Sequence, residues 1–142
     1  MLRADVPELL GNLTEMYLAY QPRGFFSGLP PVSDSACVTW WENDGAESFT
    51  RHDIGPLGTA HMGHGCDIDE DGDLDVVGCG TTGGNRWWEN DGSMNFTMHM
   101  LMDGNTSHYA SSGDLDGDDD VDLVTTDFNN GVRWWENDGS EN

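Results

Sequence analysis

The chain has 142 residues and a formal charge of −22 at neutral pH, because 27 acidic residues stand against five arginines and no lysine. Such a surface lacks the basic patch that replaces counterions on nucleic acid, and anionic membrane surfaces repel it. No apolar run reaches the roughly 18 to 20 residues of a membrane-spanning helix. We therefore expect neither nucleic-acid binding nor membrane insertion.

Residues 1–35 form an atypical amino-terminal segment, which lacks the motifs that recur later in the chain. Pro22, Pro30 and Pro31 argue against a central strand near them. The segment is interpreted as a degenerate first repeat or a separate cap. It also lacks the basic start and apolar centre of a signal peptide, so either the true start lies upstream or the export route is not visible here.

Residues 36–142 repeat with a period of 47 residues. The motif Trp-Trp-Glu-Asn-Asp-Gly begins at Trp40, Trp87 and Trp134. Glycine, aspartate and asparagine interrupt the sequence too often for helical repeats, so the period indicates a solenoid or a propeller.

Four short strands are expected within one period, at residues 61–66, 75–79, 86–90 and 95–101. The Asn-Asp-Gly-Ser segment at 90–93 favours a hairpin turn between the last two. Four antiparallel strands in about 47 residues is the size of one propeller blade. The sequence therefore predicts an all-β chain with about two complete four-stranded blades and a partial one.

Two acidic runs join the first and second expected strands of successive periods. Each run has carboxylates at positions 1, 3, 5 and 9, namely Asp67, Asp69, Asp71 and Asp75, then Asp114, Asp116, Asp118 and Asp122. Clustered like charges need a cation, and hard oxygen ligands favour Ca²⁺ over zinc or copper. An EF-hand does not fit, because position 12 is Gly78 or Thr125. Solvated turn aspartates are the alternative to two calcium sites.

These loops, together with the three Trp-Trp-Glu-Asn-Asp-Gly strands, resemble the FG-GAP or VCBS-type repeats related to the integrin α-subunit propeller. The resemblance covers residues 36–142 and implies calcium-binding blades. It also implies that Asp73 and Asp120 contribute backbone carbonyl oxygens, while the other eight aspartates contribute side chains. Position six is Gly72 in the first loop but Asp119 in the second, so the second loop is expected to be more strained or weaker.

Cysteine and histidine suggest structural roles. Cys66 and Cys79 either bridge or are small buried thiols. His61 and His108 recur at the repeat distance and are expected on the innermost strand with hydrogen-bonding roles; His64 adds only a weak indication of a metal site.

The paired tryptophans must point to opposite faces of a strand. We expect Trp40, Trp87 and Trp134 to occupy equivalent packed positions, and likewise Trp41, Trp88 and Trp135. Carbohydrate stacking is the alternative to packing between blades.

No catalytic constellation is evident, so the chain is expected not to be an enzyme. The leading hypothesis is a calcium-stabilised extracellular protein for adhesion, surface display or self-assembly, with glycans or surface proteins as further partners. The alternative is a lectin-like propeller, or the accessory part of a secreted carbohydrate-active enzyme. The last repeat stops before its fourth strand, which predicts a head-to-tail ring or filament, or further blades in a longer chain.

Overall fold

The computed structural model describes residues 37–46, 48–102 and 107–139, and in these residues the chain is entirely β-structure. The hypotheses about residues 1–35 lie outside this part. The strands are β1 (Cys37–Asn43), β2 (Phe49–Pro56), β3 (Ala60–Cys66), β4 (Asp75–Gly80), β5 (Gly84–Asn90), β6 (Phe96–Met102), β7 (Ser107–Gly113), β8 (Asp122–Asp127) and β9 (Gly131–Trp135). No helix in the described ranges is long and apolar enough to cross a membrane.

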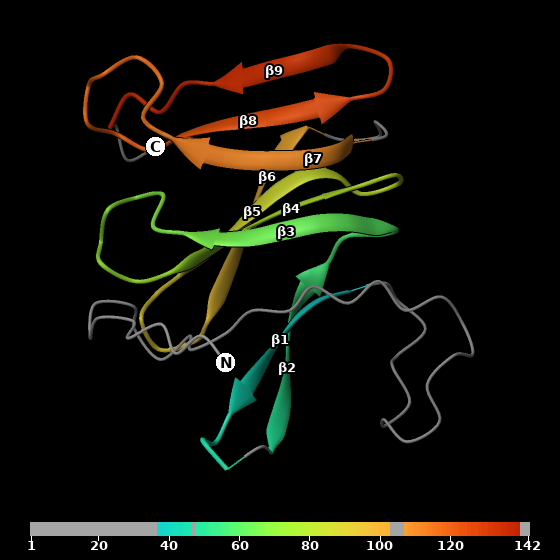
Figure 1. Cartoon of the computed structure of the whole chain (residues 1–142), viewed down its shortest axis with the longest axis vertical. Helices are drawn as coiled ribbons and strands as arrows, with labels where there is room; N and C mark the ends of the chain where they lie inside the picture. Colours follow the sequence, from blue (N-terminus) through green and yellow to red (C-terminus); the bar gives the residue numbers. More distant parts are fainter. Residues whose placement is uncertain (1–36, 47, 103–106, 140–142) are drawn as a thin grey trace.

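The strands form three separate antiparallel sheets, ordered β1-β2, β3-β4-β5-β6 and β7-β8-β9 (Figure 1). Strands β3 and β7 begin 47 residues apart, as do β4 and β8, so the sequence period is a structural period. The middle sheet is one complete four-stranded unit, and its strands match the predicted ones to within about two residues. The all-β prediction is confirmed, but the number of complete units was too high. In the described residues this is the one complete four-stranded sheet, and the other two sheets have two and three strands.

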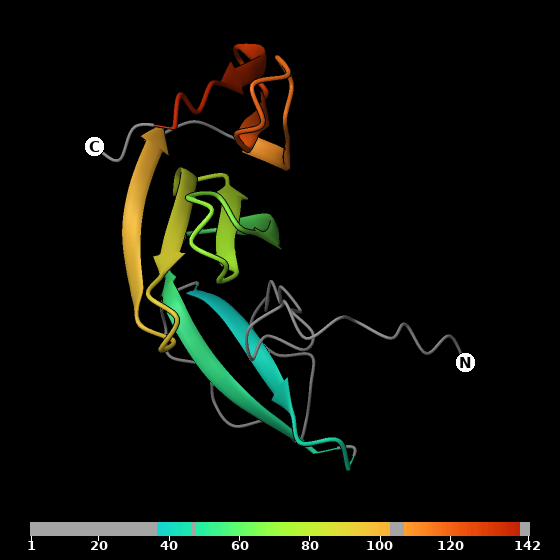
Figure 2. The same cartoon turned by 90° about the vertical axis from the view of Figure 1, so that its left-hand side faces the viewer.

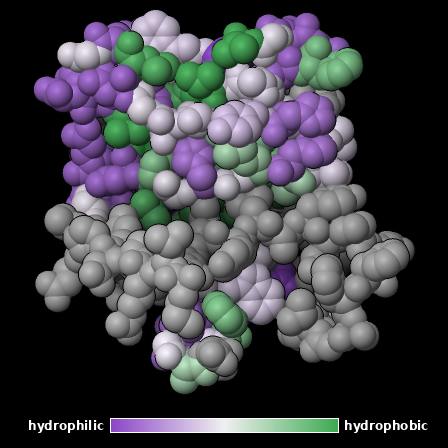
Figure 3. Space-filling model, viewed as in Figure 1, coloured by the Kyte–Doolittle hydropathy of each residue, from purple (hydrophilic) through white to green (hydrophobic). Residues whose placement is uncertain are grey.

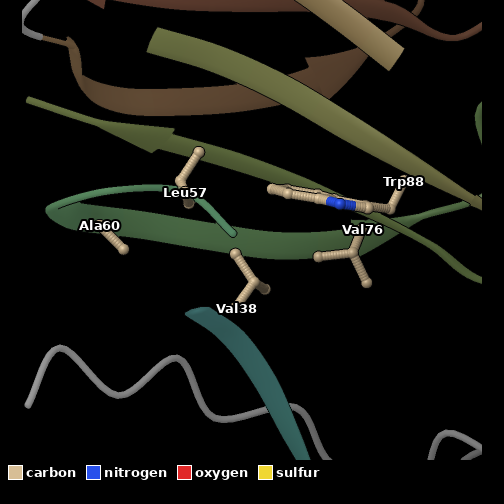
Figure 4. Close-up of a cluster of buried hydrophobic side chains, with 5 residues drawn as sticks. All are labelled: Val38, Leu57, Ala60, Val76 and Trp88. Atoms are coloured by element: carbon tan, nitrogen blue, oxygen red, sulfur yellow. The ribbon is translucent and has the colours of Figure 1, made fainter. Parts of the chain in front are cut away.

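The sheets follow one another along the long axis of the molecule (Figure 2) and bury apolar side chains between them. One cluster joins β1-β2 to the middle sheet and contains Val38, Leu57, Ala60, Val76 and Trp88 (Figure 4). The other joins the middle sheet to β7-β8-β9 and contains Ile68, Val77, Cys79, Ala110 and Leu123. Burial between sheets, rather than within one, is what holds the stack together.

The tryptophan pair of β5 divides between these clusters. Trp88 is 1% exposed in the first cluster, and Trp87 packs against the second. The predicted opposite orientation is therefore confirmed. Burial does not repeat, however: Trp40 is 3% exposed, whereas its counterpart Trp134 is 49% exposed, because no sheet in the described residues covers the outer face of β9.

The three cysteines are free, so the alternative of a Cys66–Cys79 bridge is not realised. Cys66 pairs with Asp75 and Cys79 pairs with Met62, which places the two thiols four residues apart along the ladder. That offset is about 13 Å, beyond the roughly 7 Å separation of Cα atoms that a disulfide allows. Cys79 is fully buried, as expected for a small packing thiol.

Candidate metal centre

The first acidic loop connects β3 to β4, and its carboxylates converge because the loop hydrogen-bonds to itself. Asp67 accepts the backbone N–H of Gly72 at 3.1 Å, and Asp69 accepts that of Asp71 at 3.3 Å. Carboxylate oxygens of Asp67, Asp69 and Asp71 lie within 4.8 Å of one another. Positions 1, 3 and 5 of the predicted ligand set therefore come together.

The second loop connects β7 to β8 and repeats this design. Asp114 accepts the backbone N–H groups of Gly117 at 2.7 Å and Asp119 at 3.4 Å. Here the convergent oxygens belong to Asp114, Asp116 and Asp122, again within 4.8 Å. Asp118, at position 5, lies outside that group and accepts the N–H of Asp120 at 3.1 Å. Both loops lie along one side of the molecule, where hydrophilic surface gathers (Figures 1 and 3).

The position-nine aspartates are fully buried and anchor the loops to the sheets. Asp75 accepts the backbone N–H groups of Ile68 at 2.9 Å and Asn90 at 2.8 Å. Asp122 accepts those of Leu115 at 3.0 Å and Asn137 at 2.8 Å. The equivalent of Asp122 in the first loop, Asp75, is not part of the convergent group.

The asparagines of the Trp-Trp-Glu-Asn motif hold the ends of the acidic loops, a role that the sequence interpretation missed. Asn90 donates its amide to the carbonyl of Leu74 at 3.3 Å, and Asn137 donates to that of Val121 at 3.5 Å. Each asparagine follows the position-nine aspartate by 15 residues, in both copies. That constant separation in the sequence could have indicated that each asparagine pairs with the loop of its own period.

Loop conformation bears on the expectation that the second loop is the more strained. Position six is left-handed in both copies, with φ of 94° at Gly72 and 76° at Asp119. Position four is left-handed too, with φ of 60° at Glu70 and 86° at Gly117. Each loop therefore places glycine at one left-handed position and an acidic residue at the other. Since aspartate tolerates this region better than glutamate, we now expect the first loop to be at least as strained as the second.

The electrostatics of the loops show the cost of gathering carboxylates. Burial raises the pKa of Asp75 to about 6 and also raises the pKa of Asp69. Loss of hydration, together with the nearby Asp118 carboxylate, raises the pKa of Asp116. The pKa of Asp122 is instead lowered, because the backbone N–H of Asn137 favours its charged form.

The residues present fit a hard divalent cation. The Oδ1 atom of Asp67, a residue of the convergent group, is buried and has no hydrogen-bond partner. A buried charged oxygen without a partner is unfavourable, and a cation would satisfy it. Both acidic groups could hold a metal ion.

Residues 67–125 match the family model of the FG-GAP-like repeat. The FG-GAP-like segment begins at the first ligand position and ends in β8, so it includes both acidic loops and the strands between them. No curated protein and no solved structure gives a significant match to the chain. The resemblance is thus supported as an FG-GAP-like repeat over this segment.

Proposed function

We propose that the chain is a calcium-stabilised, non-enzymatic repeat module of an extracellular, propeller-type protein. The observation that carries this is the convergence of three carboxylates in each of two loops at the repeat distance. Hard oxygen ligands and flexible loop geometry suit Ca²⁺ better than softer metals. Asp67, Asp69 and Asp71, and in the second loop Asp114, Asp116 and Asp122, would supply side-chain oxygens.

The metal would act on stability rather than on chemistry. Each loop joins the first two strands of a sheet, and its position-nine aspartate holds the end of the third strand through Asn90 or Asn137. A cation bound only by the folded loop adds its binding free energy to folding. This supports a structural role for calcium.

A role in assembly is supported by the outer face of β7-β8-β9. Trp134, Leu115 and Tyr109 are 49%, 54% and 52% exposed. Their counterparts one period earlier are Trp87, Ile68 and Met62, which all pack in the second cluster. The outer face therefore repeats the surface on which the middle sheet receives its neighbour. A further sheet of the same type fits it, from a second copy joined head to tail or from more repeats in a longer chain.

Adhesion, surface display or growth of a ring or filament would follow from such stacking. Carbohydrate binding is the second candidate, because Phe128 and Trp134 present exposed aromatic rings on which sugars can stack. A glycan array with the Trp134→Ser and Phe128→Ser variants separates the two. Selective sugar binding that both variants lose would favour the lectin-like role.

Thermal unfolding in millimolar Ca²⁺ and in chelator tests the calcium proposal. The melting temperature should be several degrees higher with calcium, and Asp69→Asn or Asp116→Asn should reduce that difference. Asp44→Asn is the charge-matched control, since Asp44 lies in an exposed turn outside the loops. Equal melts with and without calcium would refute the proposal.

Light scattering in calcium tests assembly. Trp134→Glu should prevent association, whereas Met98→Glu, which alters an exposed position on β6, should not. If the protein stays monomeric at all concentrations, head-to-tail association of separate copies is refuted. The outer face would then stack only on further repeats of a longer polypeptide.

A further inference from the structure

Two histidines meet on neighbouring sheets, away from the acidic loops. The rings of His61 and His108 lie with centroids 4.5 Å apart and an interplanar angle of 44°. Both side chains are exposed, and the two residues are one period apart in the sequence. Repetition thus brings two equivalent imidazoles into contact at an open surface.

A β-bulge positions the histidine ring in each of the two sheets. Strands β3 and β7, the edge strands of their sheets, run side by side (Figure 1). In β3 the register skips from Ala60 to Met62, so His61 is an extra, unpaired residue. In β7 it skips from Ser107 to Tyr109, so His108 is extra in the same way. Such bulges redirect side chains and recur beside functional sites.

One of the rings has a partner that would orient it for metal binding. The Nε2 atom of His61 is in hydrogen-bond contact with the hydroxyl of Thr81, which follows β4. When Nε2–H donates to that oxygen, Nδ1 keeps its lone pair. Metal-binding histidines commonly donate their second ring N–H to an oxygen in this manner, which fixes the tautomer.

We propose that His61 and His108 form a two-histidine site for a divalent transition-metal ion of the nickel and copper class. Imidazole nitrogen is a borderline ligand that suits these ions, whereas the acidic loops offer only hard oxygens. The net charge of −22 raises the local concentration of any cation. An ion held by both rings would link β3 to β7, and so one sheet to the next.

Two other histidines provide matched controls, because each is already paired on its own sheet. His52 contacts Glu42 at 3.0 Å and His99 contacts Glu89 at 2.7 Å. Each ring is also stacked on a tryptophan at 4.3 Å, Trp40 or Trp87. Neither position offers a second imidazole.

The test is calorimetric titration of Ni²⁺ into the full chain, with the acidic loops first saturated by Ca²⁺. Wild-type protein should bind one Ni²⁺, and His61→Gln or His108→Gln should weaken that binding at least tenfold. Thr81→Val should weaken it less, and His52→Gln and His99→Gln should leave it unchanged. Wild-type affinity in His108→Gln, or an equal loss in the controls, would overturn the proposal.

A second measurement needs no substitution. Paramagnetic Ni²⁺ should broaden the imidazole NMR signals of His61 and His108 first, while those of His52 and His99 stay sharp. Broadening that begins at His52 or His99 instead would also overturn the proposal.

Discussion

The side-chain amide of Asn137 donates to the carbonyl oxygen of Ile68 at 3.0 Å. Asn137 follows β9 in the last sheet, whereas Ile68 lies in the first acidic loop, between β3 and β4. The backbone N–H of Asn137 also holds Asp122 of the second loop. One residue thus connects the two candidate metal loops across the interface between the middle and last sheets.

Asn137→Ala should reduce stability and couple the two loops less tightly. The substitution removes the hydrogen bonds of the Asn137 side chain but keeps the backbone N–H that donates to Asp122. Loss of a partly buried hydrogen bond between sheets should lower the free energy of unfolding by about 1 kcal/mol. Urea unfolding in calcium measures the change, with Asn129→Ala, at an exposed position, as the control. No difference between the two variants would show that the contact contributes nothing.

Substituting glycine for Glu70 or Asp119, the acidic residues with a left-handed backbone, should stabilise the loops. Glu70 and Asp119 have φ of 60° and 76°, which side chains other than glycine adopt at a cost. Glu70→Gly should raise the free energy of unfolding by up to about 1 kcal/mol, and Asp119→Gly should raise it less.

The converse substitutions complete this test. Gly72→Ala and Gly117→Ala place a Cβ where nothing lies within 4 Å, so any loss of stability comes from the backbone alone. Chemical denaturation of the four variants in chelator separates backbone strain from metal binding. Greater stabilisation from Asp119→Gly than from Glu70→Gly would reinstate the second loop as the more strained.

The 47-residue period was sufficient to predict the strands, since backbone pairing depends on turns and alternation that the motif repeats. It was not sufficient to predict burial. Trp40 and Trp134 share a motif position but differ in exposure, because burial depends on whether a neighbouring sheet covers that face. The contact of Asn137 with Ile68 joins residues 69 apart, and no local pattern encodes it. Nor did the sequence predict that the second convergent group contains Asp122 rather than Asp118.

A buried polar residue marks a position where the sequence departs from its own period. Asn85 is fully buried, and neither its amide nitrogen nor its amide oxygen has a hydrogen-bond partner. Its counterparts in the neighbouring periods are Val38 and Val132. Because an unsatisfied buried amide costs about 1–3 kcal/mol, Asn85→Val should stabilise the protein by a similar amount.

Equilibrium denaturation of Asn85→Val checks this prediction. Asn129→Val is the control, since Asn129 is exposed and donates to Asp127 through its backbone N–H, which valine keeps. Destabilisation by Asn85→Val would mean that the amide has a partner that the apolar side chain cannot replace.

Metal-free protein should become more stable as the pH falls from 7.5 to 5. Burial raises the pKa of Asp75 from its usual 3.8 to about 6, so the folded state binds a proton that the unfolded chain still lacks at pH 5. The destabilisation by this group is complete above pH 6 and disappears as the pH falls toward 4. Between pH 7.5 and 5 the gain from Asp75 is about 1 kcal/mol.

The other loop carboxylates decide whether this slope is specific to Asp75. The pKa values of Asp69, Asp116 and Asp120 are also raised, so they act in the same direction, whereas the lowered pKa of Asp122 makes a contribution that is lost only below about pH 4. Urea unfolding midpoints at pH 7.5 and pH 5 in chelator measure the total change in stability. Asp75→Asn should reduce that change, whatever the stability of the variant itself. Saturating calcium should oppose the trend, because protons then compete with the metal for the carboxylate oxygens of Asp69 and Asp116. Burial lowers the pKa of His64, which acts in the opposite direction in the same pH range. A pH dependence that Asp75→Asn leaves unchanged would therefore show that the folded state holds Asp75 charged.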